Sequence, residues 1–222
     1  MSKIGHSNFH KRAWWVSRVM KIAIIGAGGH AKVVADAILA AGVLKLIGFL
    51  DDDPAREGEF FGHPILGRTG TWQDHAIDSF VIGIGDNLMR KRHFDRLNSA
   101  GAQLATVVHP GAIIARGVTL GAGAVALANA VVNCDTHIGP NSILNTSCTV
   151  DHDCMIGPHA HLAPGVNLAG EVRLGEGVFA GIGAKIIPRI SVGNWATIGA
   201  GAVVIRNVEE GARVVGLPAR NI

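Results

Sequence analysis

The chain has 222 residues, of which 48% are hydrophobic, 17% are charged and 5% are aromatic, with no tyrosine. A chain with this much apolar surface can bury a core, so the composition excludes a disordered protein. Glycine counts 30 residues but has no strict third-residue period, which excludes a collagen-like chain. Abundant glycine beside small and branched apolar residues predicts short β-strands separated by many turns.

The formal net charge of +3 comes from the first twenty residues, which carry four basic residues and no acid. The rest of the chain is near neutral, so charge gives little support for nucleic-acid binding. No apolar run reaches the ~18 residues of a spanning helix, and residues 1–20 lack the apolar region of a secretory signal. Trp14 and Trp15 leave a membrane-surface contact open. We instead expect residues 1–20 to be disordered or an upstream start-site extension, and the protein to be cytoplasmic.

Strand and helix patterns alternate over residues 21–108. In chain order they predict an apolar strand and glycine-rich turn, a helix, a strand ending in acids, a third strand, a second helix and a fourth strand; these are residues 21–30, 31–42, 46–54, 80–87, 87–101 and 104–110. This alternation is typical of a parallel sheet with right-handed crossovers. The sequence therefore predicts a compact α/β, Rossmann-like domain, too short for the full six-stranded double fold.

From about residue 112 the pattern changes to a six-residue repeat. Sixteen consecutive hexads each place an apolar residue at the same position, from Ile114 in steps of six to Val204. Every third hexad follows that residue with glycine, as in Leu120–Gly121 and Ile138–Gly139. Three hexads per coil predict an all-β solenoid with three flat sides, in which that glycine lets the chain bend.

These hexads resemble those of the left-handed parallel β-helix transferases. The resemblance implies a left-handed winding of residues 109–222, and sixteen hexads give a prism roughly 25 Å long at ~4.8 Å between stacked strands. A purely mechanical solenoid would need a regular outward face of threonine or a similar residue. The sequence does not contain one, which favours an enzyme.

The first candidate site is the turn Gly26–Ala31, which follows a strand and opens a helix. Its glycines allow backbone N–H groups and the helix N-terminus to approach a phosphate. Asp51, at the end of the next strand, can hold ribose or base donors. An NAD site remains open, but the missing second mononucleotide half favours a single nucleotide. The alternative is that this tight turn has a structural role only and binds no ligand.

The second candidate site lies in the middle of the hexads, where polar side chains concentrate: Asn145, Asp151, His152, Asp153, His159 and His161. A histidine between two carboxylates can be held as a neutral imidazole near pH 7, ready to accept a proton from a nucleophile. Whether Asp151 or Asp153 orients His152 is left open. The alternative is a solvated polar patch.

A metal site and a cysteine nucleophile are both less favoured. His159 and His161 alternate along a strand and could meet one metal, as in the β-helix carbonic anhydrases, but a third ligand is not obvious. Three cysteines form neither a CxxC pair nor an even set for disulfides. Cys148 and Cys154 occupy the small inward position of their hexads and are expected in the core.

The third candidate site is the C-terminal end. Small residues near 181–183 and 199–201 predict a shallow groove along one edge of the prism, and residues 216–220 resemble the closing signature of acetyl-CoA-binding hexapeptide acyltransferases. Lys185, Arg189 and Arg220 are candidates to meet the phosphates of CoA.

Residues 21–222 together resemble the nucleotide-sugar N-acetyltransferases that acetylate a 4-amino-4,6-dideoxy sugar on UDP or GDP, close to the sialic acid O-acetyltransferase-like proteins. That resemblance implies acetyl-CoA as co-substrate, no metal, a homotrimer with sites between adjacent prisms, and a place in surface glycan or glycoprotein sugar synthesis. It implies a nucleotide-sugar site at Gly28, Gly29, His30, Asp51, Asp52 and Gly85. It implies acetyl-CoA contacts at His161, Gly170, Ile182 and Ala200.

The resemblance also implies that His152 is the catalytic base and Asp153 its acidic partner, with aspartate where the family often has glutamate. The expected reaction is direct attack of the sugar amine on the thioester, with Asn145 or backbone N–H groups stabilising the oxyanion. An O-acetyltransferase and a non-catalytic nucleotide-sugar-binding protein remain the alternatives.

Overall fold

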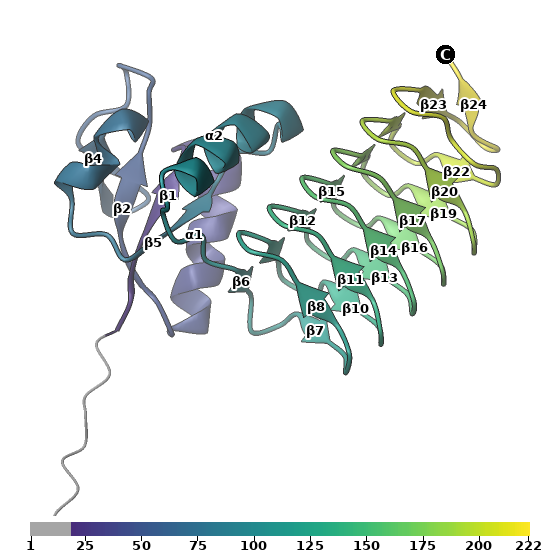
Figure 1. Cartoon of the computed structure of the whole chain (residues 1–222), viewed down its shortest axis with the longest axis horizontal. Helices are drawn as coiled ribbons and strands as arrows, with labels where there is room; N and C mark the ends of the chain where they lie inside the picture. The colour runs from purple at the N-terminus through teal and green to yellow at the C-terminus, as the bar shows by residue number, and fades with distance from the viewer. Residues whose placement is uncertain (1–18) are drawn as a thin grey trace, which may run out of the picture.

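The computed structural model describes residues 19–222, so the expectations for residues 1–18 lie outside the described part. The chain forms an N-terminal α/β domain followed by a long prism of stacked coils (Figure 1). The predicted strand–helix alternation is confirmed. Its elements are β1 (Lys21–Ile25), α1 (Gly29–Ala41), β2 (Lys45–Leu50), β5 (Ser79–Ile82) and α2 (Asn87–Ser99).

The sheet of the α/β domain has the order β3 (Glu59–Phe60), β4 (His63–Gly67), β2, β1, β5, and β1 lies between β2 and β5 and is parallel to both. The side chains of β1 are almost entirely buried because helices and neighbouring strands cover both faces. Helix α1 ends at Gly42, whose left-handed conformation (φ 65°) lets its N–H bond the carbonyl of Ile38. These elements bring the carboxyl ends of β1, β2 and β5 to one edge.

Sequence reasoning missed a hairpin and a short helix between β2 and β5. Strands β3 (Glu59–Phe60) and β4 (His63–Gly67) pair antiparallel, and the 3₁₀ helix η1 (Thr69–Asp74) follows. The two turn residues, Phe61 and Gly62, both have positive φ. A Phe–Gly pair is a weak signal for such a turn, because a bulky residue rarely adopts this conformation.

The predicted fourth strand, residues 104–110, is divided between the two parts of the molecule. Leu104 forms an isolated bridge with Phe80 of β5. Three residues later, β6 (Val107–Val108) pairs with β9 (Val125–Ala126) of the prism instead. The segment is therefore the hinge at which one sheet ends and the other begins, rather than one strand of the α/β sheet.

The sixteen predicted hexads all form strands. Each is a two-residue strand whose second residue is the predicted inward apolar residue: β7 (Ile113–Ile114), β8 (Thr119–Leu120), β9 (Val125–Ala126), β10 (Val131–Val132), β11 (His137–Ile138), β12 (Ile143–Leu144), β13 (Thr149–Val150), β14 (Met155–Ile156), β15 (His161–Leu162), β16 (Asn167–Leu168), β17 (Arg173–Leu174), β18 (Phe179–Ala180), β19 (Lys185–Ile186), β20 (Ser191–Val192), β21 (Thr197–Ile198) and β22 (Val203–Val204). The inward residues stack on their counterparts one coil away and form a continuous core. Strands β23 (Arg213–Val215) and β24 (Arg220–Asn221) close the end.

Three sheets form the walls of the prism, and their strands are parallel except for the antiparallel pair β23–β24 at the end. We call the sheet from β6 through β9, β12, β15, β18 and β21 to β24 the first wall. The sheet from β7 to β22 is the second wall, and the sheet from β8 to β20 is the third wall. The chain visits the walls in that order, so each corner belongs to a fixed pair of walls.

The glycine that recurs every eighteen residues is required for a different reason from the predicted bend of the chain. Gly139, at the corner between the third and first walls, is absent from the residues with positive φ. A Cβ atom there would lie 2.6 Å from the backbone nitrogen of Pro158 on the next coil. Close approach of stacked backbones, rather than conformational freedom, therefore requires glycine at this corner.

The α/β domain packs on the first wall. Val107, Val125 and Leu127 of the prism share a buried cluster with residues of α1. The guanidinium of Arg90 on α2 (1% exposed) donates to the carbonyl oxygens of Asn141 (3.0 Å) and His159 (2.7 Å) on the coils. Within residues 19–222, neither helix has the length and apolar character needed to cross a membrane.

Candidate active site

A cavity of about 410 Å³ opens at the carboxyl ends of β1, β2 and β5. This is the edge at which open α/β sheets bind ligands. Its lining contains all six residues predicted for the nucleotide-sugar site: Gly28, Gly29, His30, Asp51, Asp52 and Gly85. The structure therefore brings this predicted set together, although its ligand stays a prediction.

Two aspartates of this cavity form hydrogen bonds that fix the loops around it. Asp51 accepts a hydrogen bond from the N–H of Ala27 (2.6 Å), so that N–H of the glycine-rich turn is already used. Asp52 accepts from the N–H (2.9 Å) and the hydroxyl (2.6 Å) of Thr69. Burial alone would raise the pKa of Asp52, but the bonds from Thr69 outweigh it and the net pKa is lowered. The N-terminus of α1 has no side-chain cap and remains available to an anion.

His161 is buried between the α/β domain and the first wall. Its Nδ1 lies 3.1 Å from the carbonyl oxygen of Gly85, and its Nε2 lies 3.2 Å from the amide nitrogen of Asn145. The Oδ1 of Asn145 accepts from the N–H of Thr146 (2.8 Å), which turns the amide N–H₂ towards the ring. The network thus assigns the proton to Nδ1, which donates to Gly85, while Nε2 accepts.

Burial and the nearby charge of Arg90 keep this ring neutral. Desolvation is the larger cause and lowers the pKa of His161 to about 3. His30, whose ring centroid lies 6.0 Å away, has its pKa lowered to about 4 for the same two reasons. Both imidazoles are therefore uncharged throughout the neutral pH range.

A second cavity of about 700 Å³ adjoins the first and shares Gly85 with it. His161 lies in its lining, with Phe179 and Trp195 from the coils above and Arg213 near the end of the prism. This cavity combines the apolar side chains of Phe179 and Trp195 with the positive charge of Arg213. Sequence reasoning missed these last three residues, because which outward side chains face a neighbouring domain depends on how the domains dock.

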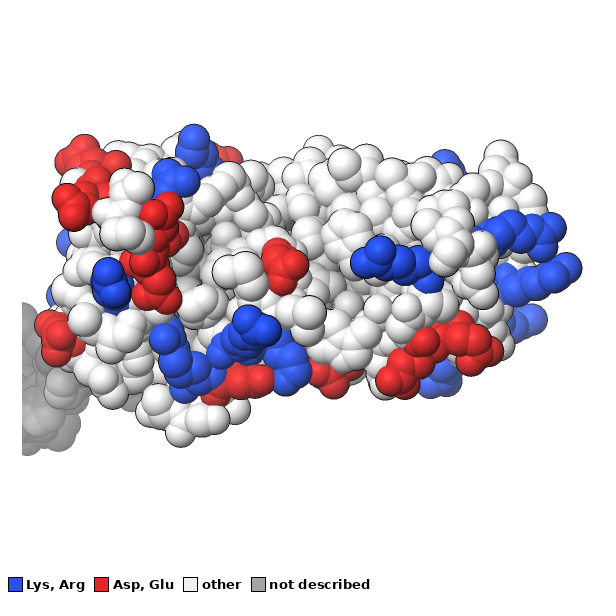
Figure 2. Space-filling model, turned by 90° about the horizontal axis from the view of Figure 1, so that it is seen from above, with Lys and Arg blue, Asp and Glu red and all other residues white. Residues whose placement is uncertain are grey.

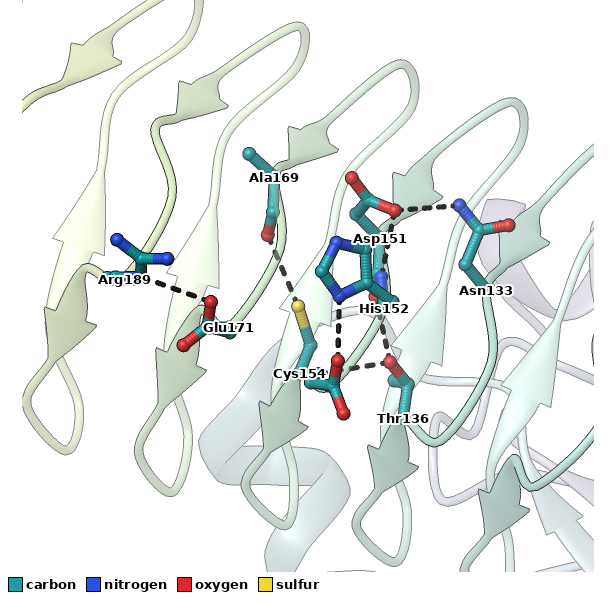
Figure 3. Close-up of polar contacts among 9 residues, drawn as sticks. Asn133, Thr136, Asp151, His152, Cys154, Ala169, Glu171 and Arg189 are labelled. Carbon is teal, nitrogen blue, oxygen red and sulfur yellow. Dashed lines mark hydrogen bonds and ion pairs between the residues drawn. The ribbon is translucent and has the colours of Figure 1, made fainter.

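His152 lies at the corner between the second and third walls, about half exposed (Figure 3). Its Nδ1 is 2.7 Å from Oδ2 of Asp153, which directs Nε2 away from that carboxylate. Asp151 instead accepts from the backbone N–H of His152 and from the amide of Asn133, both at 2.9 Å. Asp153 therefore orients the ring, and Asp151 holds the backbone that carries it.

The carboxylates act on His152 in the opposite sense to the predicted one. The hydrogen bond that Nδ1–H donates to Asp153 is the largest cause and the charge of Asp151 the next, and together they raise the pKa of His152 above its ordinary value. The ring is thus made more basic rather than held neutral, since negative neighbours stabilise the imidazolium. An exposed imidazole with one nitrogen fixed and the other free has the geometry of a general base.

Other predicted site residues are separated within one chain. Asn145 contacts His161 and not His152, because strand β13 and its flanking turns lie between the two corners. Ile182 (63% exposed) and Ala200 lie at the corner between the first and second walls, where the N–H of Gly201 bonds the carbonyl of Ile182. The fourth residue predicted to contact acetyl-CoA, Gly170, lies instead beside the His152 ring.

The alternatives based on cysteine or metal gain no support from the described residues. Cys148 and Cys154 are buried in the core, as predicted, and burial raises the pKa of the Cys148 thiol to about 12. Among residues 19–222, the structure contains no cluster of three or more potential metal-ligating side chains. Of the three basic candidates for CoA phosphates, Arg189 is paired with Glu171 at 3.1 Å.

Arg90 is a site-positioning residue that sequence reasoning missed. Besides its bonds to the coils, it donates to the carbonyl oxygen of Gly85 at 2.9 Å, the same oxygen that faces His161. Burial lowers the pKa of Arg90 to about 10, so it remains charged at neutral pH. An arginine on a helix that also carries the exposed Arg92 and Arg96 gives no sequence signal of such burial.

Comparisons with known proteins agree with this layout. Residues 21–97 match the PglD N-terminal domain, and residues 171–206 match the bacterial transferase hexapeptide (six repeats). The chain is 36% identical over 110 residues to the UDP-N-acetylbacillosamine N-acetyltransferase of Bacillus subtilis (strain 168). That match covers 48% of this chain, which spans about half (51%) of the length of the relative.

Solved structures match over nearly the whole chain. The acetyltransferase domain of PglB from Neisseria gonorrhoeae FA1090 is 35% identical, with a TM-score of 0.87, over 91% of this chain and 99% of that domain. PerB from Caulobacter crescentus, in complex with CoA and GDP-perosamine, is 35% identical with a TM-score of 0.86, over 92% and 98% of the two chains. With these identities over nearly the whole length of both matched chains, this chain belongs to the family of nucleotide-sugar N-acetyltransferases that join a PglD N-terminal domain to a left-handed β-helix of hexapeptide repeats.

Proposed function

We propose that this protein transfers the acetyl group of acetyl-CoA to the 4-amino group of a nucleotide-linked 4-amino-4,6-dideoxy sugar, for surface glycan or glycoprotein sugar synthesis. The observation that carries the proposal is His152, whose Nδ1 is bonded to Asp153 while Nε2 is left to take a proton. The relative from Caulobacter crescentus is in complex with CoA and GDP-perosamine, and that from Bacillus subtilis is a UDP-N-acetylbacillosamine N-acetyltransferase.

The two adjoining cavities suit the two substrates. In the smaller one, the uncapped N-terminus of α1 faces a diphosphate, and the aspartates accept N–H or O–H groups of the nucleoside. The larger one offers Phe179 and Trp195 to an apolar pantetheine arm and Arg213 to phosphate. Since both cavities contain Gly85, the sugar and the thioester meet beside His161.

His152 accepts a proton at Nε2 while the sugar amine attacks the thioester carbonyl carbon and forms the C–N bond. Asp153 stabilises the resulting imidazolium through Nδ1–H. The amide group of Asn145 has two N–H donors, one towards His161 and a second for the developing oxyanion. As the C–S bond breaks, the imidazolium returns its proton to the CoA sulfur. The products are the acetamido sugar and free CoA.

This reaction needs a second copy of the chain. His152 lies at the corner between the second and third walls, whereas both cavities lie on the first wall or the α/β domain. In a homotrimer, the corner of one prism faces the first wall of its neighbour. Exposed apolar side chains on the prism, such as Ile182 and Met155, support burial between copies. In the view of Figure 2, uncharged residues cover most of the upper side of the prism.

The first test is His152→Ala with acetyl-CoA and a panel of UDP- and GDP-linked amino sugars. Losing a general base is expected to lower kcat about 10²–10⁴-fold with little change in either KM. His137→Ala is the matched control, because His137 is another exposed histidine of the prism. Turnover of His152→Ala near that of the control excludes the proposed base. Acetylation of hydroxyl sugars alone indicates an O-acetyltransferase, and binding without any transfer indicates a nucleotide-sugar sensor.

The second test addresses the shared site. Gly29→Trp fills the nucleotide cavity from a position with open space around it. Each variant alone is expected to be nearly inactive. When Gly29→Trp and His152→Ala are co-expressed, hybrid trimers should form. In each hybrid trimer, one interface joins an intact His152 to an intact nucleotide cavity. Activity above the sum of the two variants supports a site between copies, and activity equal to that sum contradicts it.

A further inference from the structure

The free edge of the His152 ring lies against the α-carbon of Gly170 on the next coil. A Cβ atom at Gly170 would be 2.7 Å from Cε1, 2.8 Å from Nε2 and 3.4 Å from Cδ2 of that ring. Ordinary carbon–carbon contacts are about 3.5–4.0 Å. The three atoms nearest to such a Cβ all belong to His152, so this imidazole occupies the space that a side chain would need.

The backbone itself does not require glycine at this position. Gly165 and Gly183 on neighbouring turns have φ values of +69° and +68°, which favour glycine. Gly170 is not among the residues with positive φ, so alanine fits its backbone conformation. Unlike Gly139, whose Cβ would meet the next backbone, Gly170 is crowded only by a side chain that can move.

We propose that Gly170 is a positioning residue: its missing side chain lets the His152 ring lie against the next coil, with Nδ1 on Asp153 and the Nε2 edge beside residue 170. This inference rests on the proposed function of His152. It gives Gly170 a role distinct from the acetyl-CoA contact that the family resemblance implies. The ring is held from two directions, by the carboxylate of Asp153 on one edge and the flat surface at Gly170 on the other.

A methyl group at residue 170 displaces the ring without a clash against the backbone. The imidazole then rotates about its side-chain bonds, which breaks the 2.7 Å contact between Nδ1 and Asp153 and moves Nε2. Misplacing a reacting group by about 1 Å costs roughly 10²-fold in rate. Figure 3 shows the exposed ring at the corner of the prism, beside the coil that carries Ala169.

The test is Gly170→Ala in the wild-type and His152→Ala backgrounds. In the wild-type background we expect kcat to fall roughly 10–100-fold, with KM for acetyl-CoA unchanged within about twofold. In the His152→Ala background the same change should have no further effect, because the ring through which it acts is absent. Gly70→Ala is the control, since Gly70 has open space and no positive φ.

A second readout is the titration of His152 followed by its ring NMR signals. In Gly170→Ala the pKa should fall towards the ordinary histidine value, because the bond to Asp153 is lost. An unchanged titration overturns the proposal. So does an equal loss of activity in both backgrounds with a raised KM for acetyl-CoA, which identifies a direct contact with the cofactor. Near-normal turnover of His152→Ala contradicts the proposed function instead, and the titration still tests the positioning.

Discussion

His161 and His152 are nine residues apart, and the two sides of the prism give them opposite chemistry. His161 lies under the α/β domain at 7% exposure, where burial lowers its pKa to about 3. His152 lies at an uncovered corner between two carboxylates, which raise its pKa. One imidazole is a buried neutral hydrogen-bonding group, and the other is exposed and more basic than an ordinary histidine. The difference shows that a cluster of histidines in a sequence does not act as one site.

The largest expected effect is a loss of stability on replacing Arg90, the buried side chain that joins α2 to the coils beside His161. Arg90→Met leaves the buried carbonyl oxygens of Asn141 and His159 without their side-chain donor. Each unsatisfied group costs ~1–3 kcal/mol. We therefore expect the free energy of unfolding to fall by about 3 kcal/mol and Tm to fall by roughly 6–12 °C. Thermal unfolding measures it. Arg90→Lys keeps the charge and some donors and should lose less, and a change below about 2 °C in Arg90→Met contradicts this account.

The next effect lowers the basicity of the exposed ring. Asp153→Asn removes the carboxylate that bonds Nδ1, so the pKa of His152 should fall. A base works when deprotonated, so activity is lost as pH falls through its pKa. The acid limb of the kcat/KM profile should therefore move to lower pH, with kcat about tenfold lower at its plateau. Asp151→Asn is the control and should move the limb less, and an unmoved limb in Asp153→Asn would show that another group titrates.

The smallest expected effect is on the pH profile and tests the buried ring of His161. Asn145→Ala removes the donor to Nε2 of His161 and the proposed donor to the oxyanion, so kcat should fall about 10²-fold. The pH profile between pH 6 and 8 should keep its shape, because burial holds the pKa of His161 far below this range. A new titration in that range would show that the ring is not held neutral by its surroundings.

The comparison also shows which site features the sequence could predict. The six residues predicted for a nucleotide-sugar site line one cavity, because strand ends of one parallel sheet meet at one edge. Asn145 and His152, predicted to act together, do not meet within the chain. They are close in sequence, but one strand separates them, so they lie at different corners of the coil. The choice between Asp151 and Asp153 needed coordinates, because both flank His152 and only Asp153 contacts its ring.

By itself the sequence determined the prism. Each hexad carries its own inward residue and needs only its neighbours one coil away, so the repeat from Ile114 to Val204 could be counted strand by strand. The tertiary structure decided which polar residues are buried and which are free. That depends on docking the α/β domain against the first wall, where Gly85 and His161 meet although 76 residues separate them. Burial sets the charge of an imidazole, and burial is a property of the packed domains rather than of any local stretch of chain.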